Sequence, residues 1–501
     1  MVTIRLPGQL RNYAGGQEFI DVPASTVEAA LRELVVAYPD LRVRFFDDQN
    51  RLHSHLAVFY REAEVARGDM ASVSVSSGER LDVLIAVAGG SDDVRMSGFR
   101  ERATVEETLA TALDGVVPLG SETVAVTDCA GRVLAADVVS EVDVPSFRRA
   151  TMDGYALRAE DSYGASSYSP VLLNVEGQSL PGARSVEAVR PGGAFRIMTG
   201  APVPEGATAV LRAEDATERT GRLEVRAPVA EGRNIGRVGE DIAAGTIVLH
   251  QGRRLLPQDA GLLASIGHDP VLVHSRPRVR IVVSGDELLA PGEKPTGTSI
   301  VDSNSPMLAA LVERDGGRPD VVRLRDDRTA MTVALTGVGA DIIVTAGAAS
   351  VGSEDIVPIL VAELGELLVH GVAMRPSSPT GIGRVGGTPV LLLPGNPVSA
   401  LVAYDFFAGP VIRTMSGLPA GWPYATLRLP LAKRLVSQIG RTDYARVLIT
   451  DGMVEPLAVS GASVLSSVTR ASGFVVIPAG LEGYAEGAEV DVHLYDSQAV
   501  L

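Results

Sequence analysis

The second half of the chain repeats one pattern, in which a short apolar run is followed by a segment with helical spacing. The apolar runs are RIVVS, DVVRL, DIIVTAG and TPVLLLPG, and the helix-like segments begin near Ser305, Arg328, Ser353 and Pro397. Short continuous apolar runs are typical of strands buried on both faces, and their alternation with helices indicates a parallel sheet covered on both sides. We therefore predict a doubly wound α/β unit over residues 278–421.

The chain has 501 residues, too many for one ordinary core, so further units are expected around this one. At the start, strand-like VTIRL and QEFIDV, helical STVEAALRELVVAYP and strand-like HLAVFY and ERLDVLIAV follow the order of a ubiquitin-like β-grasp domain. We predict this domain at 1–90 and a polar, glycine-bearing linker at 91–98. Residues 99–277 are predicted to hold a helix and an elongated β-rich unit, and residues 422–501 a small β barrel.

Composition excludes several classes of protein. The net charge of −16 argues against a broad nucleic-acid surface, and no apolar run approaches the roughly 18 residues that a membrane span needs. The N-terminus has no secretory pattern, and Cys129 is the single cysteine, so internal disulfides and thiolate zinc sites are excluded. We expect a cytoplasmic protein without nucleic-acid or membrane partners.

Three strands of the predicted sheet end in unusual loops: SGDEL, TAGAASVGSED and PGNPVS. Ligands of open α/β sheets bind at the carboxyl ends of the strands, so these loops are expected to form one pocket. The small residues after Thr345 allow close backbone approach to a phosphate or oxyanion, and Thr345 and Ser350 add hydroxyls. Any one of these loops taken alone is better explained as a plain connection, because glycine-rich turns after strands are common.

Carboxylates accompany these loops. Asp286 and Glu287 lie in SGDEL, Asp355 follows the glycine loop, Asp153 lies in MDGYA and Asp241 in GEDIAAG. Carboxylates brought into one pocket repel one another unless a divalent cation or a proton neutralises them, so such a cluster predicts a hard metal, most naturally Mg²⁺. Because the chain has 61 acidic residues, spacing alone favours the alternative of scattered surface acids.

Two stretches of the middle region are the least generic, TMDGYALRAED and MTGAPVPEGATAV. In the second stretch, Thr-Gly-Ala followed by two prolines indicates a rigid turn. This turn would present the hydroxyl of Thr199 and free backbone N–H groups. Turn chemistry by itself accounts for both stretches equally well.

Taken in order, the motifs resemble one family closely. These motifs are DVPSFRRATMDGYALRAED, IMTGAPVPEGATAVLRAED, GRNIGRVGEDIAAG, VVSGDELLAPGE, VDSNSPML, TAGAASVGSED, LLLPGNPVSALVAYDFF and VLSSVTRASGFVVIP. From about Arg100 to the end, the chain is similar to the molybdopterin molybdotransferases, that is, MoeA and the gephyrin E domain. The first ninety residues resemble the small sulfur-carrier (MoaD-like) subunit of molybdopterin synthase, through the β-grasp pattern and the closing VAGG at Gly90.

The resemblance implies a fold with a MogA-like α/β domain, and an activity. That activity is the insertion of molybdate into adenylated molybdopterin, with release of AMP and with help from Mg²⁺. It assigns Mg²⁺ to Glu287 and Asp355, and it implies a homodimer in which Asp153, Thr199 and Asp241 of the β-rich unit reach the pocket of the partner. The resemblance also implies a set of residues that bind the substrate: Ser284, Gly285, Asp286, Thr345, Gly347, Ser350, Gly352, Arg375, Pro394, Gly395, Asn396 and Pro397.

Two departures from the family pattern bear on activity. The family commonly has TSGGVS, and here Ala346, Ala348 and Ala349 replace Ser, Gly and Val. The family usually has KPGKP, and here RPSSP keeps one cation at Arg375 but has Ser378 where the second lysine is expected. A missing cation is expected to weaken the binding of molybdate or of the pterin phosphate.

Alternatives remain for both parts of the chain. The enzyme could handle another oxyanion, such as tungstate, or the chain could be a scaffold that binds pterin without turnover. The first domain could be a working sulfur carrier that meets the large subunit of molybdopterin synthase, or a fused docking module. A carrier needs a thiocarboxylate at Gly90, which requires that the bond after Gly90 be cut.

Overall fold

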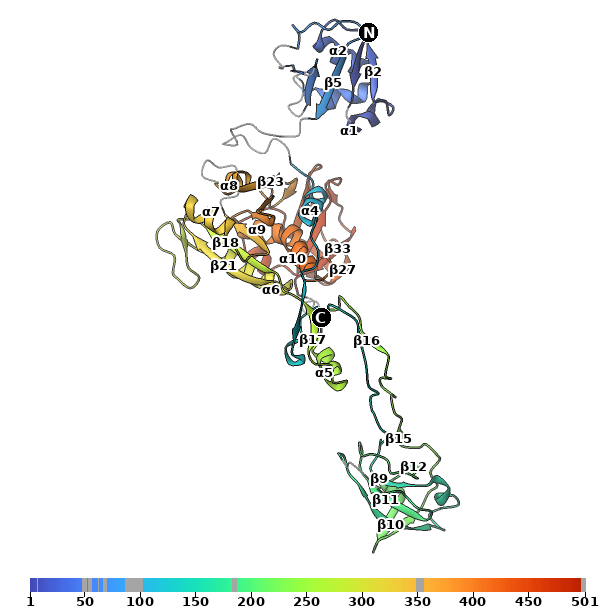
Figure 1. Cartoon of the computed structure of the whole chain (residues 1–501). Helices are drawn as coiled ribbons and strands as arrows, with labels where there is room; N and C mark the ends of the chain where they lie inside the picture. The colour runs from blue at the N-terminus through green and yellow to red at the C-terminus, as the bar shows by residue number, and fades with distance from the viewer. Residues whose placement is uncertain are drawn as a thin grey trace.

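The structure is a computed structural model, and it describes residues 1–6, 8–46, 52, 56–61, 63–65, 70–85, 102–182, 187–347 and 356–496. The predicted linker and Gly90 lie outside these residues. Figure 1 shows an extended molecule, with the N-terminal unit at one end, the α/β and C-terminal units together in the middle and a β-rich unit at the other end. In the described part of the chain, no helix has the length and apolar character needed to cross a membrane.

The N-terminal unit is a five-stranded sheet with one long helix packed against it. Its elements are β1 Val2–Arg5, α1 Gly8–Arg11, β2 Phe19–Val22, α2 Val27–Ala37, α3 Arg42–Phe45, β3 Leu56–Tyr60, β4 Ala63–Glu64 and β5 Arg80–Ile85. The sheet order is β2-β1-β5-β3-β4, with β1 and β5 parallel. Helix α2 begins after Thr26, which caps it, and buries Val27, Ala30, Leu31 and Leu34 at helical spacing. This topology confirms the β-grasp prediction.

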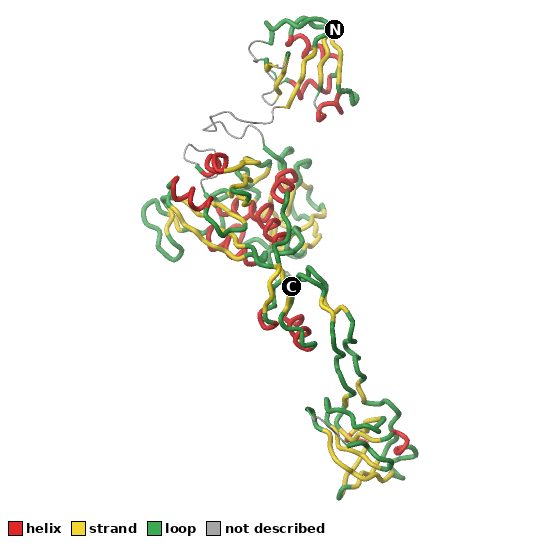
Figure 2. The backbone as a smooth tube through the Cα atoms, in the orientation of Figure 1, coloured by secondary structure: helices red, strands yellow, loops and turns green. Residues whose placement is uncertain are grey.

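The middle region forms a six-stranded sheet, a long connector and a smaller helix-containing part, and its first helix packs against the α/β unit. Its elements are α4 Val105–Leu113, β6 Ser121–Val124, β7 Val138–Val139, β8 Arg149–Ala150, β9 Gly154–Leu157, β10 Val171–Ser179, β11 Gly193–Ile197, β12 Ala209–Arg212, β13 Ala216–Arg219, β14 Arg222–Val225, β15 Ile235–Gly236, β16 Ile247–Leu249, α5 Pro257–Ser265 and β17 Val271–His274. Strands β9 to β14 make one six-stranded sheet. The pairs β7–β16 and β8–β15 belong to a long connector, drawn in Figure 2 as two mostly irregular segments side by side.

The α/β unit has a six-stranded sheet in the order β21-β18-β22-β26-β25-β23. Its elements are β18 Arg278–Ser284, β19 Leu288–Leu289, β20 Ile300–Val301, α6 Asn304–Arg314, β21 Arg318–Leu324, α7 Arg328–Thr336, β22 Ile342–Ala346, α8 Val357–Leu364, β23 Gly365–His370, β24 Met374–Arg375, β25 Gly381–Val385, β26 Thr388–Leu393, α9 Pro397–Ala403, a π-helical turn Tyr404–Ala408 and α10 Gly409–Met415. One face of the sheet packs against α7 and α8, and the other against α4, α6, α9 and α10. Helices on both faces confirm the doubly wound prediction.

Two details of this sheet correct the sequence-based expectation. The four predicted strands are parallel, but β25 and β23 add an antiparallel edge, so the sheet is mixed. The extra pairing arises because Gly386 and Gly387 both have positive φ and close a two-residue hairpin between β25 and β26. The run DVVRL was expected to be buried, yet β21 is an edge strand whose side chains are mostly exposed.

The C-terminal unit is built of strands with one short helix. Its elements are β27 Thr426–Pro430, β28 Leu435–Val436, β29 Thr442–Thr450, β30 Met453–Ala458, α11 Ser466–Thr469, β31 Gly473–Ile477, β32 Gly483–Tyr484 and β33 Glu489–Leu494. The order β30-β29-β31-β33-β27 returns on itself where Leu431, just after β27, bridges Val454 on β30. This closure agrees with the predicted small barrel. Strand β24 also joins this sheet beside β29.

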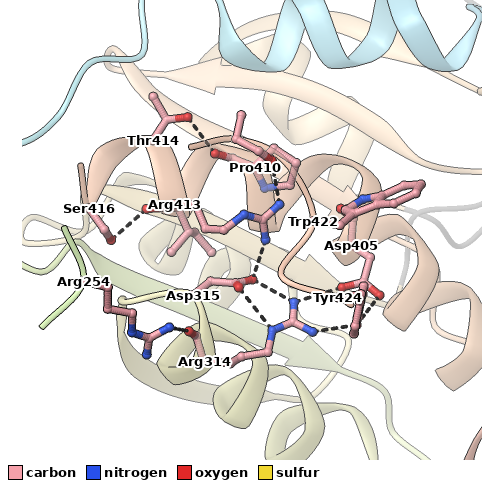
Figure 3. Close-up of polar contacts among 12 residues, drawn as sticks. Arg254, Arg314, Asp315, Asp405, Pro410, Arg413, Thr414, Ser416, Trp422 and Tyr424 are labelled. Carbon is pink, nitrogen blue, oxygen red and sulfur yellow. Dashed lines mark hydrogen bonds and ion pairs between the residues drawn. The ribbon is translucent and has the colours of Figure 1, made fainter. Parts of the chain in front are cut away.

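A buried polar network ties the C-terminal unit to the α/β unit (Figure 3). The Arg314 guanidinium contacts the carboxylates of Asp315 and Asp405 at 2.9 and 3.0 Å and donates to the Tyr424 hydroxyl at 2.6 Å. Arg413 contacts Asp315 at 3.0 Å, and both carboxylates are fully buried. Burial raises the pKa of Asp405, and the neighbouring Arg314 opposes that rise. The two guanidiniums and two carboxylates therefore compensate one another inside the protein.

Candidate functional site at the strand ends

The carboxyl ends of three neighbouring parallel strands lie together. Strand β18 ends at Ser284, and Gly347 and Gly395 follow β22 and β26. The register pairs β18 with β22 and β22 with β26, and the Gly347 N–H donates to the carbonyl of Leu393, the last residue of β26, at 3.4 Å. The three predicted loops thus start from one place, which we call the strand-end cluster: Ser284, Asn304, Thr345, Gly347 and Gly395.

Gly347 permits this close approach. Its φ is +108°, and a Cβ at this position would lie 2.7 Å from the Ser284 carbonyl oxygen. A Cβ on Gly395 would in turn lie 3.3 Å from the Cα of Gly347. Larger residues at these positions would push the strand ends apart, because both contacts are with backbone atoms.

The variant Gly347→Ala is therefore expected to lose about 1–3 kcal/mol of stability and to weaken ligand binding at the cluster. Chemical denaturation and a binding titration measure the two effects. The matched control is Gly292→Ala, which also has positive φ, at +96°, but has nothing within 4 Å of the added Cβ. Equal effects of the two substitutions would show that the contact with Ser284 is unimportant.

Two buried polar atoms of the cluster have no hydrogen-bond partner among the described residues, Thr345 Oγ1 and Asn304 Oδ1. Thr345 is 1 % and Asn304 8 % exposed. The Asn304 side chain is oriented by its Nδ2, which donates to the Gly395 carbonyl at 2.7 Å. Buried oxygens without partners are costly, so their presence at a strand-end pocket favours a ligand there.

Asn304 was missed by the sequence reasoning. It opens α6 within DSNSP, where Asp302 accepts hydrogen bonds from the N–H and hydroxyl of Ser305. A run of small polar residues before the apolar helix was the available signal, because such residues bond to the backbone at helix starts.

The predicted carboxylates after β18 are Asp286 and Glu287, and both are exposed. The Glu287 carboxylate folds back beside Gly285, about where a side chain on that glycine would lie. Asp355, Ser350 and Gly352 fall outside the described residues. Within the described residues no three His, Cys, Asp or Glu side chains come together as a metal site.

The PGNP loop is supported by the C-terminal unit. The Asn396 Oδ1 accepts from the Ser463 hydroxyl at 2.7 Å, and the Val398 N–H donates to the Ala462 carbonyl at 3.0 Å. Pro397 is the first residue of α9, where its missing N–H costs nothing, and Pro394 lies between β26 and Gly395. The loop conformation therefore depends on a segment more than sixty residues further along the chain.

Arg375 directs its guanidinium to Asp443, a fully buried carboxylate that also accepts from Arg441 Nε at 3.1 Å and Ser437 Oγ at 2.8 Å. In the RPSSP loop, Ser377 has φ of +83° and its hydroxyl donates to the Ser399 carbonyl at 2.7 Å. The loop is thus fastened to α9 on one side and to β29 on the other. The positive charge of Arg375 is therefore compensated, at least in part, by the carboxylate of Asp443.

Asp153 and Thr199 meet in the β-rich unit. Because Gly154 of β9 pairs with Ile197 of β11, the residues beyond these ends lie side by side. The Asp153 Oδ1 accepts from the Thr199 N–H at 2.7 Å and from its hydroxyl at 2.9 Å, and these bonds lower the pKa of Asp153. Asp241 lies in the connector, where its N–H donates to the Val144 carbonyl.

Thr199→Val is expected to raise the pKa of Asp153 towards its ordinary value without fully restoring it, because the backbone N–H, the larger cause of the shift, remains. A carboxyl NMR titration of the full-length protein measures the shift. A lowered folded pKa contributes stability above the unfolded pKa, and that contribution is lost as pH falls through the folded pKa. An unchanged Asp153 titration in the variant would contradict the hydroxyl contribution.

The strand-end cluster and the Asp153 pair lie far apart in one chain. Figure 1 shows β9, β10, β11 and β12 at the far end of the connector, away from the α/β unit that holds the cluster. A single copy of the chain therefore does not bring Asp153, Thr199 and Asp241 to the cluster.

Comparisons with known proteins agree on one family. Family models match in order: "MoeA N-terminal region (domain I and II)" at residues 103–267, "Probable molybdopterin binding domain" at 280–414, and "MoeA C-terminal region (domain IV)" at 428–495. Molybdopterin molybdenumtransferase 2 of Mycobacterium tuberculosis is 37% identical over 74% of this chain and 94% of its own length. Molybdopterin molybdenumtransferase of Staphylococcus aureus is 30% identical over 80% of this chain and 97% of its own length.

A solved structure of the molybdopterin biosynthesis MoeA protein from Pyrococcus horikoshii is 32% identical, with a TM-score of 0.66, over 79% of this chain and all of that one. The matched segments contain the α/β sheet, the β-rich unit and the C-terminal barrel described above. The chain therefore belongs to the MoeA family of molybdopterin molybdenumtransferases, enzymes of molybdenum cofactor biosynthesis.

Proposed function

We propose that this protein inserts molybdate into adenylated molybdopterin and releases AMP, in the cytoplasm, with the strand-end cluster as the substrate site. The observation that carries the proposal is the pair of buried, partnerless oxygens of Thr345 and Asn304 where three strand-end loops converge. In the proposed complex these groups and the neighbouring backbone orient the substrate. In this proposal Ser284, Gly285, Asp286, Gly347 and the PGNP residues bind the substrate together with Ser350 and Gly352, which lie outside the described residues.

The donor set at this edge fits Mg²⁺. Glu287 supplies an exposed carboxylate, and Thr345 supplies a hydroxyl oxygen without a hydrogen-bond partner among the described residues. Mg²⁺ is a hard cation and prefers such oxygen ligands. We propose that Glu287 and Asp355 hold the ion. When bound, the ion neutralises the negative charge that develops as the phosphoanhydride breaks. In this proposal Glu287 and Asp355 also help to position the phosphate of the adenylate.

A homodimer completes the proposed site. The β-rich unit of a second copy would bring Asp153, Thr199 and Asp241 to the cluster, which one copy does not do. Two exposed apolar side chains flank the Asp153 pair in sequence, Met152 at 45 % and Met198 at 53 % exposure. In the proposed dimer the partner would cover these two side chains.

The test uses the full-length protein with adenylated molybdopterin, Mg²⁺ and molybdate, and measures AMP by chromatography. AMP release that requires both ions is the expected result, and binding of the adenylate without AMP release would favour a scaffold instead. Parallel reactions with tungstate decide which oxyanion is preferred. A molybdate titration in the same assay measures the affinity for molybdate. We expect this affinity to be weak, because Ser378 carries no charge and the guanidinium of Arg375 already contacts Asp443.

For the first unit we propose a sulfur carrier that meets the large subunit of molybdopterin synthase. The supporting observation is its independent hydrophobic core, together with the central position of β5, whose end leads directly to VAGG. Intact mass spectrometry of protein from its native cell tests this. A fragment that ends at Gly90 with a thiocarboxylate is expected, and only uncut chains would favour a docking module.

A further inference from the structure

Arginines gather at the opposite edge of the α/β sheet, near the amino ends of its strands. Arg132, Arg254 and Arg276 line a hollow of about 150 Å³, which we call the arginine hollow. It adjoins a wider groove of about 790 Å³ that shares Arg132 and Arg276 and adds Arg278 and Arg318, the first residues of β18 and β21. The strand-end cluster lies at the carboxyl ends of these strands, so the two places are separate.

Backbone carbonyls orient the three guanidiniums of the hollow. Arg276 donates to the carbonyls of Gly316 and Gly317 at 3.2 and 2.6 Å, and Arg254 donates to the Arg314 carbonyl at 2.9 Å (Figure 3). Arg132 donates to the His274 carbonyl at 2.8 Å and also contacts Glu122. A carbonyl fixes a guanidinium without neutralising it, so Arg254 and Arg276 keep their charge and further N–H groups.

Charge in the hollow is unbalanced. Three arginines line it with one carboxylate, Glu313, in a chain of net charge −16. Burial, followed by repulsion from Arg132, Arg254 and Arg318, lowers the pKa of Arg276, and Glu313 partly opposes this. Three acids line the wider groove: Glu122 contacts Arg132, Asp341 accepts the backbone N–H of Arg278 at 2.7 Å, and Glu313 is shared with the hollow. Among the described residues that line the two places, none forms an ion pair with Arg254 or Arg276.

We propose that the arginine hollow binds a phosphate-type oxyanion, either free or as a nucleoside monophosphate whose remainder lies in the wider groove. Guanidinium groups match tetrahedral oxyanions through paired N–H donors, and a bound dianion would relieve the repulsion among these arginines. The volume of the hollow suits one such group, and the groove is large enough for a nucleoside. This binding is independent of the reaction proposed for the strand-end cluster.

The test maps protection of individual arginines in the full-length protein. Phenylglyoxal modification is followed by peptide mass spectrometry, with increasing inorganic phosphate or AMP and with sodium chloride at equal ionic strength. Phosphate and AMP are expected to protect Arg254 and Arg276, and chloride is not. Equal protection by the two ligands identifies free oxyanion as the ligand, and stronger protection by AMP identifies the monophosphate.

Two variants change the expected binding in opposite directions, so misfolding cannot imitate both. For Arg276→Gln, protection of Arg254 should need about tenfold more phosphate, because charge-assisted hydrogen bonds are lost. For Glu313→Gln it should need roughly threefold less, since a repelling charge is removed. Arg44→Gln is the control, because Arg44 also donates to a carbonyl but lies in the N-terminal unit. No protection beyond that of chloride, or three variants that all behave like the unaltered protein, would overturn the proposal.

Discussion

Replacing Glu287 with glutamine is expected to lower the rate of AMP release by about a hundredfold or more, because a preorganised group that stabilises developing charge is lost. Glutamine keeps the size of the side chain but is a weaker ligand for Mg²⁺. Initial rates over a magnesium titration measure the effect. The apparent magnesium requirement should rise together with the fall in the maximal rate.

The control for this experiment is Glu366→Gln, an exposed carboxylate on β23, at the edge of the sheet farthest from β18 along the strand order. It changes the net charge by the same amount and should leave AMP release unchanged. A Glu287→Gln protein that releases AMP at the full rate and at the same magnesium concentration would remove Glu287 from the proposed metal site.

Asp405→Ala is expected to lower the free energy of unfolding by about 3–5 kcal/mol, since it removes a fully buried carboxylate and leaves the half-buried Arg314 without one of its partners. The Asp405 side chain accepts from Arg314 and, at 2.9 Å, from Tyr424, and its carbonyl accepts from the Trp422 indole at 2.9 Å. Trp422 is the only tryptophan of the chain, so its fluorescence during urea denaturation reports on this network directly.

Two further variants grade the result. Tyr424→Phe removes one hydroxyl and should cost about 1 kcal/mol. Arg328→Ala breaks an exposed ion pair with Glu363, and its cost should stay below about 1 kcal/mol. If Asp405→Ala cost no more than Arg328→Ala, the buried network would not contribute substantially to the stability of the protein.

Much of the α/β unit followed from the sequence because its signals are local. Pro397 at a helix start, and apolar runs separated by helical spacing, depend on residues close together in the chain. The antiparallel edge was not predicted, although the Gly386–Gly387 pair indicates a hairpin, because the alternation of strands and helices does not show which strand pairs with the residues before Gly386. The exposure of β21 could not be predicted, because a short apolar run occurs in edge strands as well as in central ones. Only the pairing of the strands shows which kind it is.

Some residues of the candidate site could be predicted from the sequence, and others could not. Ser284, Gly347 and Gly395 could be placed together, because the carboxyl ends of parallel strands meet at one edge of a sheet. The roles of Asn304 and Ser463 could not be predicted, since each contacts a loop more than sixty residues away in the sequence. The engagement of Arg375 by Asp443 is likewise a product of pairing between β24 and β29.

By itself, the sequence determined the identity and order of the units, the β-grasp start and the strand-end loops, because periodicity, turn residues and ordered motifs are properties of short segments. Only the tertiary structure decided which polar atoms are buried without partners, which charges compensate one another, and that arginines from separate units meet at the opposite edge of the sheet. It also decided that Asp153 lies at the end of a long connector, away from the cluster of its own chain. Such facts depend on packing between distant segments, and the free energy of that packing is not encoded in any local pattern.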